Sequence, residues 1–164
     1  MNRILSYLLL VTVALLAAPT AAFADMSKKV ITTFKGQIIV TDGEAPTSGD
    51  DKETIAAIKK AQLTSVTGEK NAEDVTVWHF HYTAFLSKAG PTSLKMVFYT
   101  DDKEKRYAAD QRLDGVDPKS PVFSGDVSIT EDDGLNKGRS YIIKMVATVG
   151  GKDTTLAQTT LKMK

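Results

Sequence analysis

The chain has no cysteine among its 164 residues. This absence excludes disulfide bonds, thiolate metal sites, cysteine nucleophiles and the acylated cysteine of a lipoprotein. Histidine is scarce as well, with two copies in the whole chain. Stability must therefore come from an ordinary hydrophobic core, which a chain of this length is able to build.

A surplus of charge of either sign is also lacking, since the formal net charge is +1. Loss of Arg3 with an N-terminal signal would leave acidic and basic residues equal in number. Nucleic-acid binding usually requires a basic surplus to neutralise phosphates. The composition predicts a mixed, solvated surface and no nucleic-acid partner.

The only long apolar run lies at the N-terminus, from Ile4 to Ala18 behind the basic Arg3. It is followed by Ala22-Phe23-Ala24, the small-x-small pattern of a cleavage site. The run is shorter than the roughly 20 residues of a membrane-spanning helix, so stable membrane insertion is not expected. Residues 1–24 are predicted to be a cleaved signal peptide and residues 25–164 one exported domain. Because exported eukaryotic domains more often carry disulfides, we expect a bacterial protein that is periplasmic or secreted.

The mature chain is dominated by alternation of apolar and polar residues, which is typical of strands with one buried face. Strands are predicted at Val30–Val40, Val75–Leu86, Leu94–Thr100, Lys105–Leu113, Val122–Thr130, Ser140–Val149 and Thr154–Met163. About seven strands with few intervening helices predict an all-β antiparallel sandwich, with a barrel as the alternative.

One segment departs from this alternation, between Asp50 and Gln62. Ile55 and Ile58 recur at helical spacing, and Asp50 with Glu53 forms a capping-box pattern. The apolar stripe is narrow and rich in alanine. The segment is therefore predicted to be the single helix of the domain, lying on its surface.

The segment Leu135 to Tyr141, LNKGRSY, resembles the tyrosine corner of immunoglobulin-like and fibronectin type III domains. The resemblance implies an immunoglobulin-like sandwich in which the Tyr141 hydroxyl bonds to backbone a few residues upstream. The Cys and Trp spacing of antibody domains is missing, and a fold of this kind carries no particular function.

The two histidines, His79 and His81, share one face of the strand Val75–Leu86 because they are two residues apart. The pair is similar to the His-x-His element of Cu/Zn superoxide dismutases, and Met96 is the one soft ligand expected nearby. Structural and catalytic zinc sites usually have three or more protein ligands, so weak or no binding of Zn²⁺ or Cu²⁺ is expected. Val75, Val77 and Phe85 share this face, which predicts a helix or a partner covering part of it.

Two further ligand classes have candidate residues. Acidic pairs that could bind calcium occur at Asp101-Asp102, at Asp114 with Asp117, and at Glu131-Asp132-Asp133, without the spacing of a known calcium loop. Exposed aromatic side chains could bind carbohydrate, and Tyr99, Tyr107 and Phe85 are the candidates.

Catalytic motifs such as the nucleophile elbow, the phosphate-binding loop and His-Glu-x-x-His are absent from the sequence. The sequence is therefore interpreted as a non-enzymatic binding or accessory module without a cofactor, acting on a protein partner. The alternatives are a small metal-binding protein that uses His79 and His81, and a carbohydrate-binding module.

Overall fold

The computed structural model describes residues 26–47, 49–89, 93–117, 119–149 and 151–164. The predicted signal peptide and its cleavage site lie outside these ranges. Within them the elements follow in this order: α1 (Lys28–Phe34), β1 (Gln37–Thr41), α2 (Asp51–Ala61), β2 (Ser65–Val66), β3 (Glu69–Lys70), β4 (Thr76–Phe85), β5 (Leu94–Thr100), β6 (Tyr107–Leu113), β7 (Val122–Thr130), the 3-10 helix η1 (Glu131–Asp133), β8 (Ser140–Val149) and β9 (Lys152–Met163). Three predicted strands are confirmed with identical bounds, and those corresponding to β4, β6 and β9 begin or end within two residues of their prediction.

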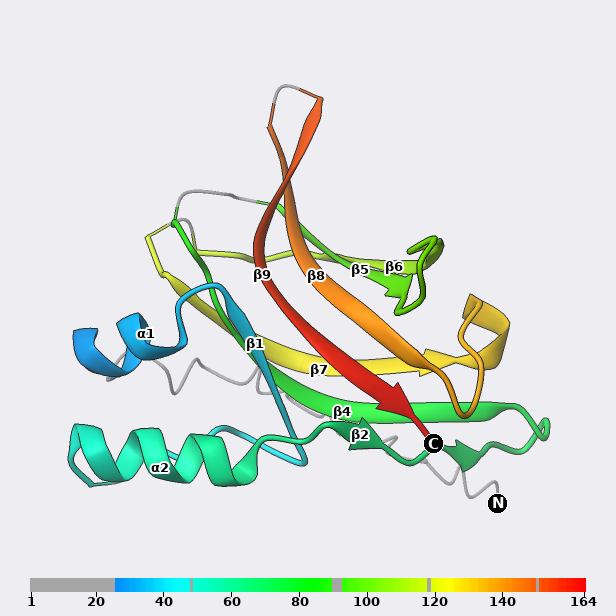
Figure 1. The fold of residues 1–164 in the computed structure, drawn as a ribbon, viewed down its shortest axis with the longest axis horizontal. Helices are drawn as coiled ribbons and strands as arrows, with labels where there is room; N and C mark the ends of the chain where they lie inside the picture. The colour runs from blue at the N-terminus through cyan, green and yellow to red at the C-terminus, as the bar shows by residue number, and fades with distance from the viewer. Residues whose placement is uncertain (1–25, 48, 90–92, 118, 150) are drawn as a thin grey trace, which may run out of the picture.

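The strands form one mixed sheet that curls into a half-barrel (Figure 1). Its order is β3-β4-β1-β9-β8-β5-β6, β7 pairs with β4, and β2 pairs with β9. Phe85 of β4 has both Gln37 and Val122 as register partners, so β1 and β7 lie on opposite edges of β4. Strands β7 and β6 are consequently the outermost strands of the curled sheet.

The predicted antiparallel immunoglobulin-like sandwich is not confirmed. The all-β prediction holds, but the strands belong to one sheet, and β9 runs parallel to both β1 and β2. Register shifts occur in β5 between Phe98 and Tyr99 and in β8 between Met145 and Val146. Irregularities of this kind bend a strand and increase its twist, which lets one sheet enclose a core by itself.

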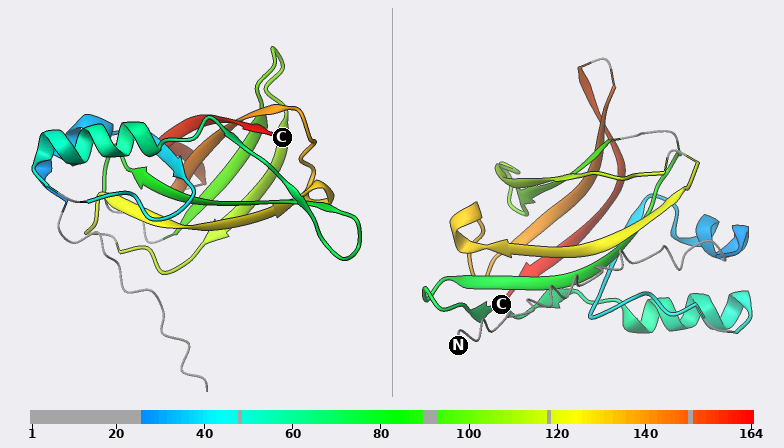
Figure 2. Two further views of the ribbon diagram at one scale, coloured as in Figure 1. Left: turned by 90° about the horizontal axis from the view of Figure 1, so that it is seen from below. Right: turned by 180° about the vertical axis from the view of Figure 1, so that it is seen from behind.

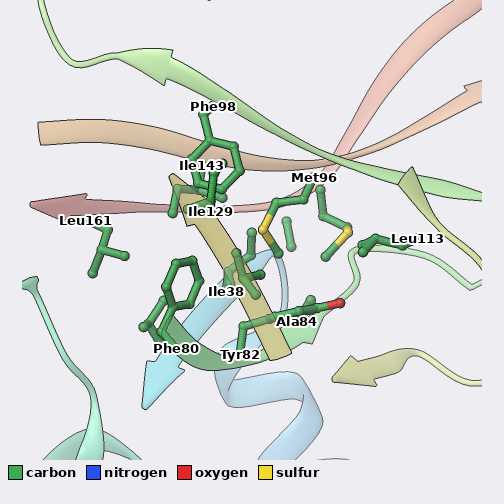
Figure 3. Packing of buried hydrophobic residues seen from close by; sticks show 14 of the residues in the cluster. Ile38, Phe80, Tyr82, Ala84, Met96, Phe98, Leu113, Ile129, Ile143 and Leu161 are labelled. Atoms are coloured by element: carbon green, nitrogen blue, oxygen red, sulfur yellow. The ribbon is translucent and has the colours of Figure 1, made fainter. Parts of the chain in front are cut away.

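The concave side of the sheet holds the main hydrophobic core (Figure 3). The predicted core face of β4 is confirmed, because Trp78, Phe80, Tyr82 and Ala84 are all buried there. The facing strands complete the core with Ile38, Met96, Phe98, Leu113, Ile129, Ile143 and Leu161. The interior of the half-barrel is thus filled by side chains.

The segment predicted as a first strand from Val30 to Val40 begins as a helix instead, and this prediction was wrong for its first half. Helix α1 is capped by Ser27, whose hydroxyl accepts a hydrogen bond from the backbone N–H of Val30 at 3.3 Å. Val30 and Phe34 are four residues apart and both are buried. Gly36, at a φ of 80°, then turns the chain into β1. Burial of one helical face outweighs the β-propensity of Ile31 and its neighbours.

Helix α2 confirms the predicted helix, and the Asp50 side chain caps it by accepting a hydrogen bond from the N–H of Glu53 at 2.8 Å. It is not the single helix, since α1 packs beside it (Figure 2). Together the two helices cover part of the convex side of the sheet through a second hydrophobic cluster. That cluster comprises Val30, Phe34, Ile39, Ala45, Ile58, Phe85 and Val122.

The half-barrel therefore has two unlike walls. We call β1, β4 and β7 the covered wall, because the second cluster buries part of their convex side. We call β5, β6 and β8 the bare wall, because none of their residues belongs to that cluster. The views in Figures 1 and 2 place both helices away from β5 and β6.

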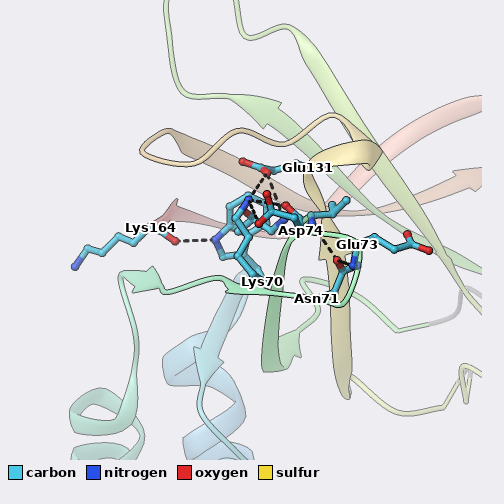
Figure 4. A network of polar contacts seen from close by, with 9 residues as sticks. Lys70, Asn71, Glu73, Asp74, Glu131 and Lys164 are labelled. Atoms are coloured by element: carbon cyan, nitrogen blue, oxygen red, sulfur yellow. Dashed lines mark hydrogen bonds and ion pairs between the residues drawn. The ribbon is translucent and has the colours of Figure 1, made fainter.

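At one end of the covered wall a polar network joins distant segments (Figure 4). The Lys70 ammonium lies 3.9 Å from a carboxylate oxygen of Glu131, which also accepts a hydrogen bond from the N–H of Thr76 at 3.3 Å. The Trp78 indole donates to the backbone carbonyl of Lys164 at 3.1 Å. These contacts hold β3, β4, η1 and the last strand together.

Tyr141 is fully buried, and its hydroxyl accepts a hydrogen bond from the backbone N–H of Asn136 at 2.7 Å. The bond reaches five residues upstream and fixes the turn that leads into β8. In this chain the corner belongs to a single curled sheet, so it does not identify an immunoglobulin-like fold. Among the described helices, neither is long and apolar enough to span a membrane.

Candidate functional site

A hollow with a volume of about 470 Å³ lies beside the histidines of β4, along the paired strands β4 and β7. It is lined by Asp42, His79, Phe80, His81, Gln111, Asp126, Val127 and Ser128. Gln111 comes from β6, the strand at the other end of the sheet. The hollow therefore extends from β4 and β7 to β6.

Strand register explains why the polar residues gather here. His79 is opposite Ser128 and His81 is opposite Asp126, so these four side chains share the convex face of β4 and β7. On the other edge of β4, His81 is opposite Thr41 of β1, and Asp42 follows directly in the chain. Both histidines lie on one face, as their spacing predicted.

His81 has a defined orientation. Its Nδ1 lies 2.9 Å from a carboxylate oxygen of Asp126, and its side chain is only 9% exposed whereas that of Asp126 is 84% exposed. A carboxylate oxygen accepts hydrogen bonds, so Nδ1 is the donor in this contact. Nε2 is buried and has no hydrogen-bond partner. A buried polar atom without a hydrogen-bond partner is costly. Packing of the surrounding residues therefore does not account for a histidine at position 81.

The two histidines differ sharply in environment, since His79 is exposed and His81 is buried. Met96 cannot join them, because it is fully buried in the main core on the concave side. That part of the metal hypothesis was wrong: residues of β5 that face inward never meet the convex face of β4. Within the described ranges, no group of three or more His, Asp or Glu side chains is arranged to hold a metal ion.

Tyr82 lies on the concave side of the same wall, behind Asp126 and the hollow. Burial, and then the negative charge of Asp126, raises the pKa of the Tyr82 hydroxyl well above its usual range, so it stays neutral. Its register partner is Gly125, where a Cβ would lie 3.2 Å from the Tyr82 hydroxyl oxygen. An added Cβ at Gly125 would therefore press tightly against the Tyr82 side chain.

The acidic loops use several of their carboxylates to shape the chain. Asp102 accepts hydrogen bonds from the Thr100 hydroxyl and the N–H groups of Glu104 and Lys105. The Thr100 hydroxyl bond contributes most to holding the pKa of Asp102 below its usual range. Asp133 accepts from the N–H of Thr130 at 2.8 Å. These carboxylates act as turn and helix caps.

Of the three candidate aromatic residues, Phe85 is fully buried beneath the helices and is 5.2 Å from Phe34 between ring centroids. Its proposed role as an exposed platform was wrong, because α1 covers that face. Tyr99 and Tyr107 lie on the bare wall with ring centroids 6.4 Å apart, edge to face. Tyr107 is 60% exposed.

Sequence reasoning missed Asp126, Asp42 and Gln111 as neighbours of the histidines. Asp126 is 45 positions from His81 in the chain. Alternation in residues 122–130 predicted the strand, but only the pairing register places Asp126 beside His81. Comparisons of the chain with family models, with curated proteins and with solved structures find no match. Function is therefore inferred from the geometry above.

Proposed function

We propose that the protein is an exported binding module without chemistry of its own, and that the hollow around His81 and Asp126 holds a positively charged group of its partner. The observation that carries this proposal is the pair of His81 and Asp126, which are 2.9 Å apart and both line the hollow. Buried, oriented polar groups in a concave site are typical of ligand recognition.

Charge indicates which partner fits. The acidic residues of the lining are Asp42 and Asp126, and neither lysine nor arginine is among the described lining residues. The hollow thus offers hydrogen-bond acceptors and negative charge. A lysine ammonium or an arginine guanidinium of a partner protein supplies the complementary donors.

Catalysis is less well supported than binding. A general base must present its lone pair to a substrate, whereas Nε2 of His81 is covered by protein. The one hydroxyl of the lining, Ser128, is opposite His79 and not opposite His81. A nucleophile paired with an oriented histidine is therefore not assembled among these residues.

The test is an NMR titration of the mature protein with N-acetyl-arginine amide and N-acetyl-lysine amide, and with N-acetyl-glutamate amide as the anionic control. Backbone amide shifts should move at residues 79–81 and 126–128 with the cationic probes alone. Asp42→Asn combined with Asp126→Asn should abolish the response. Equal responses to all three probes, or no response at the hollow, would refute the proposal.

The same titration addresses the metal alternative, for which two histidines alone do not complete a coordination shell. Zn²⁺ should bind weakly and with little loss on His79→Ala. Tight binding that either His79→Ala or His81→Ala abolishes would replace the proposed function with metal binding.

Export is proposed from the N-terminal sequence, with the mature chain in the periplasm or outside the cell. N-terminal sequencing of protein expressed in a bacterium with its native start should give Asp25 as the first residue. Intact Met1 on membrane-bound material would show that residues 1–24 are kept as an anchor.

A further inference from the structure

The convex face of the bare wall presents a row of outward side chains from three neighbouring strands. Register places them together: Lys95, Val97 and Tyr99 on β5, Tyr107, Asp110 and Arg112 on β6, and Ile142, Lys144 and Val146 on β8. Val97 and Val146 are buried although they lie outside both hydrophobic clusters. Lys144 is the register partner of Val97, and long side chains of this kind cover apolar residues while keeping their charge in water.

One end of this face is aromatic. Tyr107 is the only large hydrophobic side chain that is exposed among the described residues. Its hydroxyl donates a hydrogen bond to Asp110, and its ring meets the ring of Tyr99 edge to face. The Lys144 ammonium lies 4.9 Å from the centroid of the Tyr99 ring. The arrangement offers apolar ring surface next to polar and cationic groups.

The other end is basic and hollowed. Lys95 and Arg112 are register partners, and with Ser93, Leu94, Val146 and Thr148 they line a hollow of about 260 Å³. Lys95 makes no ion pair with any described residue. The Nε of Arg112 donates a hydrogen bond to the Asp114 carboxylate at 3.1 Å, an ion pair that leaves the terminal nitrogens of Arg112 as further donors. Two cations around one hollow favour an anionic group, and carboxylates pair well with arginine.

We infer that this face binds an acidic polysaccharide, with a sugar ring against Tyr107 and a uronate carboxylate at Lys95 and Arg112. Tyr99 is four positions after Lys95 along β5, a span of about 13 Å at ~3.3 Å per residue. An extended chain that repeats both sugar rings and carboxylates meets both ends of the face at once. A nucleic acid fits less well, because the whole protein lacks a basic surplus.

The experiment is affinity electrophoresis of the mature protein through gels containing polygalacturonate, with dextran as the neutral control. The variants are Tyr107→Ala and the double variant Lys95→Ala with Arg112→Ala. The matched control is Lys59→Ala with Lys60→Ala, which removes the same charge from the exposed end of α2. Urea midpoints confirm that each variant is folded.

Polygalacturonate should retard the wild-type protein and dextran should not. The Lys95–Arg112 double variant should weaken binding by about tenfold and Tyr107→Ala by several-fold, whereas the α2 control should stay near wild type. Equal weakening by the two double variants would mean diffuse charge attraction and would overturn the inference. Absence of retardation, or equal binding to double-stranded DNA, would also overturn it. None of these outcomes depends on the hollow around His81.

Discussion

The two walls of the half-barrel use the same strand pattern in different ways. On the covered wall, Phe85 and Ile39 point to the convex side and are fully buried beneath the helices. On the bare wall, the convex positions of Tyr107 and Arg112 are exposed. The difference shows that alternation defines the concave core on both walls, while the layer outside the sheet decides what the convex side does.

The largest effect is expected on the covered wall, at side chains that are buried between the sheet and the helices. Phe85→Ala removes the ring that packs on Phe34 and leaves a cavity, so we expect a loss of about 3–5 kcal/mol in the free energy of unfolding. Tyr107→Ala on the bare wall should change it by less than about 0.5 kcal/mol. Urea unfolding measures both, and similar losses would contradict the distinction between the walls.

A second, smaller effect should arise where the turn after η1 lies against β6. Gly134 has a φ of 103°, and a Cβ there would lie 2.6 Å from the backbone carbonyl oxygen of Ala108. Gly134→Ala should cost about 1–3 kcal/mol through backbone strain and this contact. Gly138 is the control, because it also has a positive φ but no atom within 4 Å of the added Cβ. A loss no greater than that of Gly138→Ala would show that the contact is unimportant.

The buried corner before β8 should give an effect of about 1 kcal/mol. Tyr141→Phe removes only the hydroxyl, which leaves the N–H of Asn136 without its partner. Tyr107→Phe is a matched change on the bare wall, where the hydroxyl bond to Asp110 is exposed. Thermal or urea midpoints compare the two, and an unchanged midpoint for Tyr141→Phe would mean that water replaces the bond without cost.

The smallest effect concerns acid stability. Hydrogen bonds from Thr76, and then the charge of Lys70, hold the pKa of Glu131 below its usual value near 4.5. A lowered folded-state pKa contributes stability that is complete above the usual value and is lost as the pH falls through the folded-state pKa. Glu131→Gln should therefore flatten the acid arm of the stability curve, as should Asp102→Asn in the turn between β5 and β6. An acid arm identical to wild type in both would contradict the assigned bonds.

The covered wall also shows how far sequence reasoning reaches. Alternation in residues 75–86 predicted β4 and its concave side chains, and the apolar residues on its other face predicted a cover. Helix α1 was missed because Val30 and Phe34 are spaced by four, which fits both a strand face and a helical turn. The missing information was tertiary: the burial of Phe34 against Phe85 selects the helix.

The candidate sites were only partly predictable for a related reason. His79 and His81 were placed on one face by their spacing, because that relation is local. Their contact with Asp126 depends on the register between β4 and β7, and the burial of Phe85 depends on where the helices dock. The face of a strand on which a side chain lies could be read from the sequence. The contacts between strands could not, because they depend on the pairing register.

We propose that the two walls carry separate binding sites of opposite charge. Chemical-shift mapping of the mature protein with N-acetyl-arginine amide, and then with an oligogalacturonate, tests it most directly. The cationic probe should move amides at residues 79–81 and 126–128, and the acidic sugar should move those at residues 95–99 and 107–112. Shifts from both probes on the same wall, or from neither probe on either wall, would contradict the account.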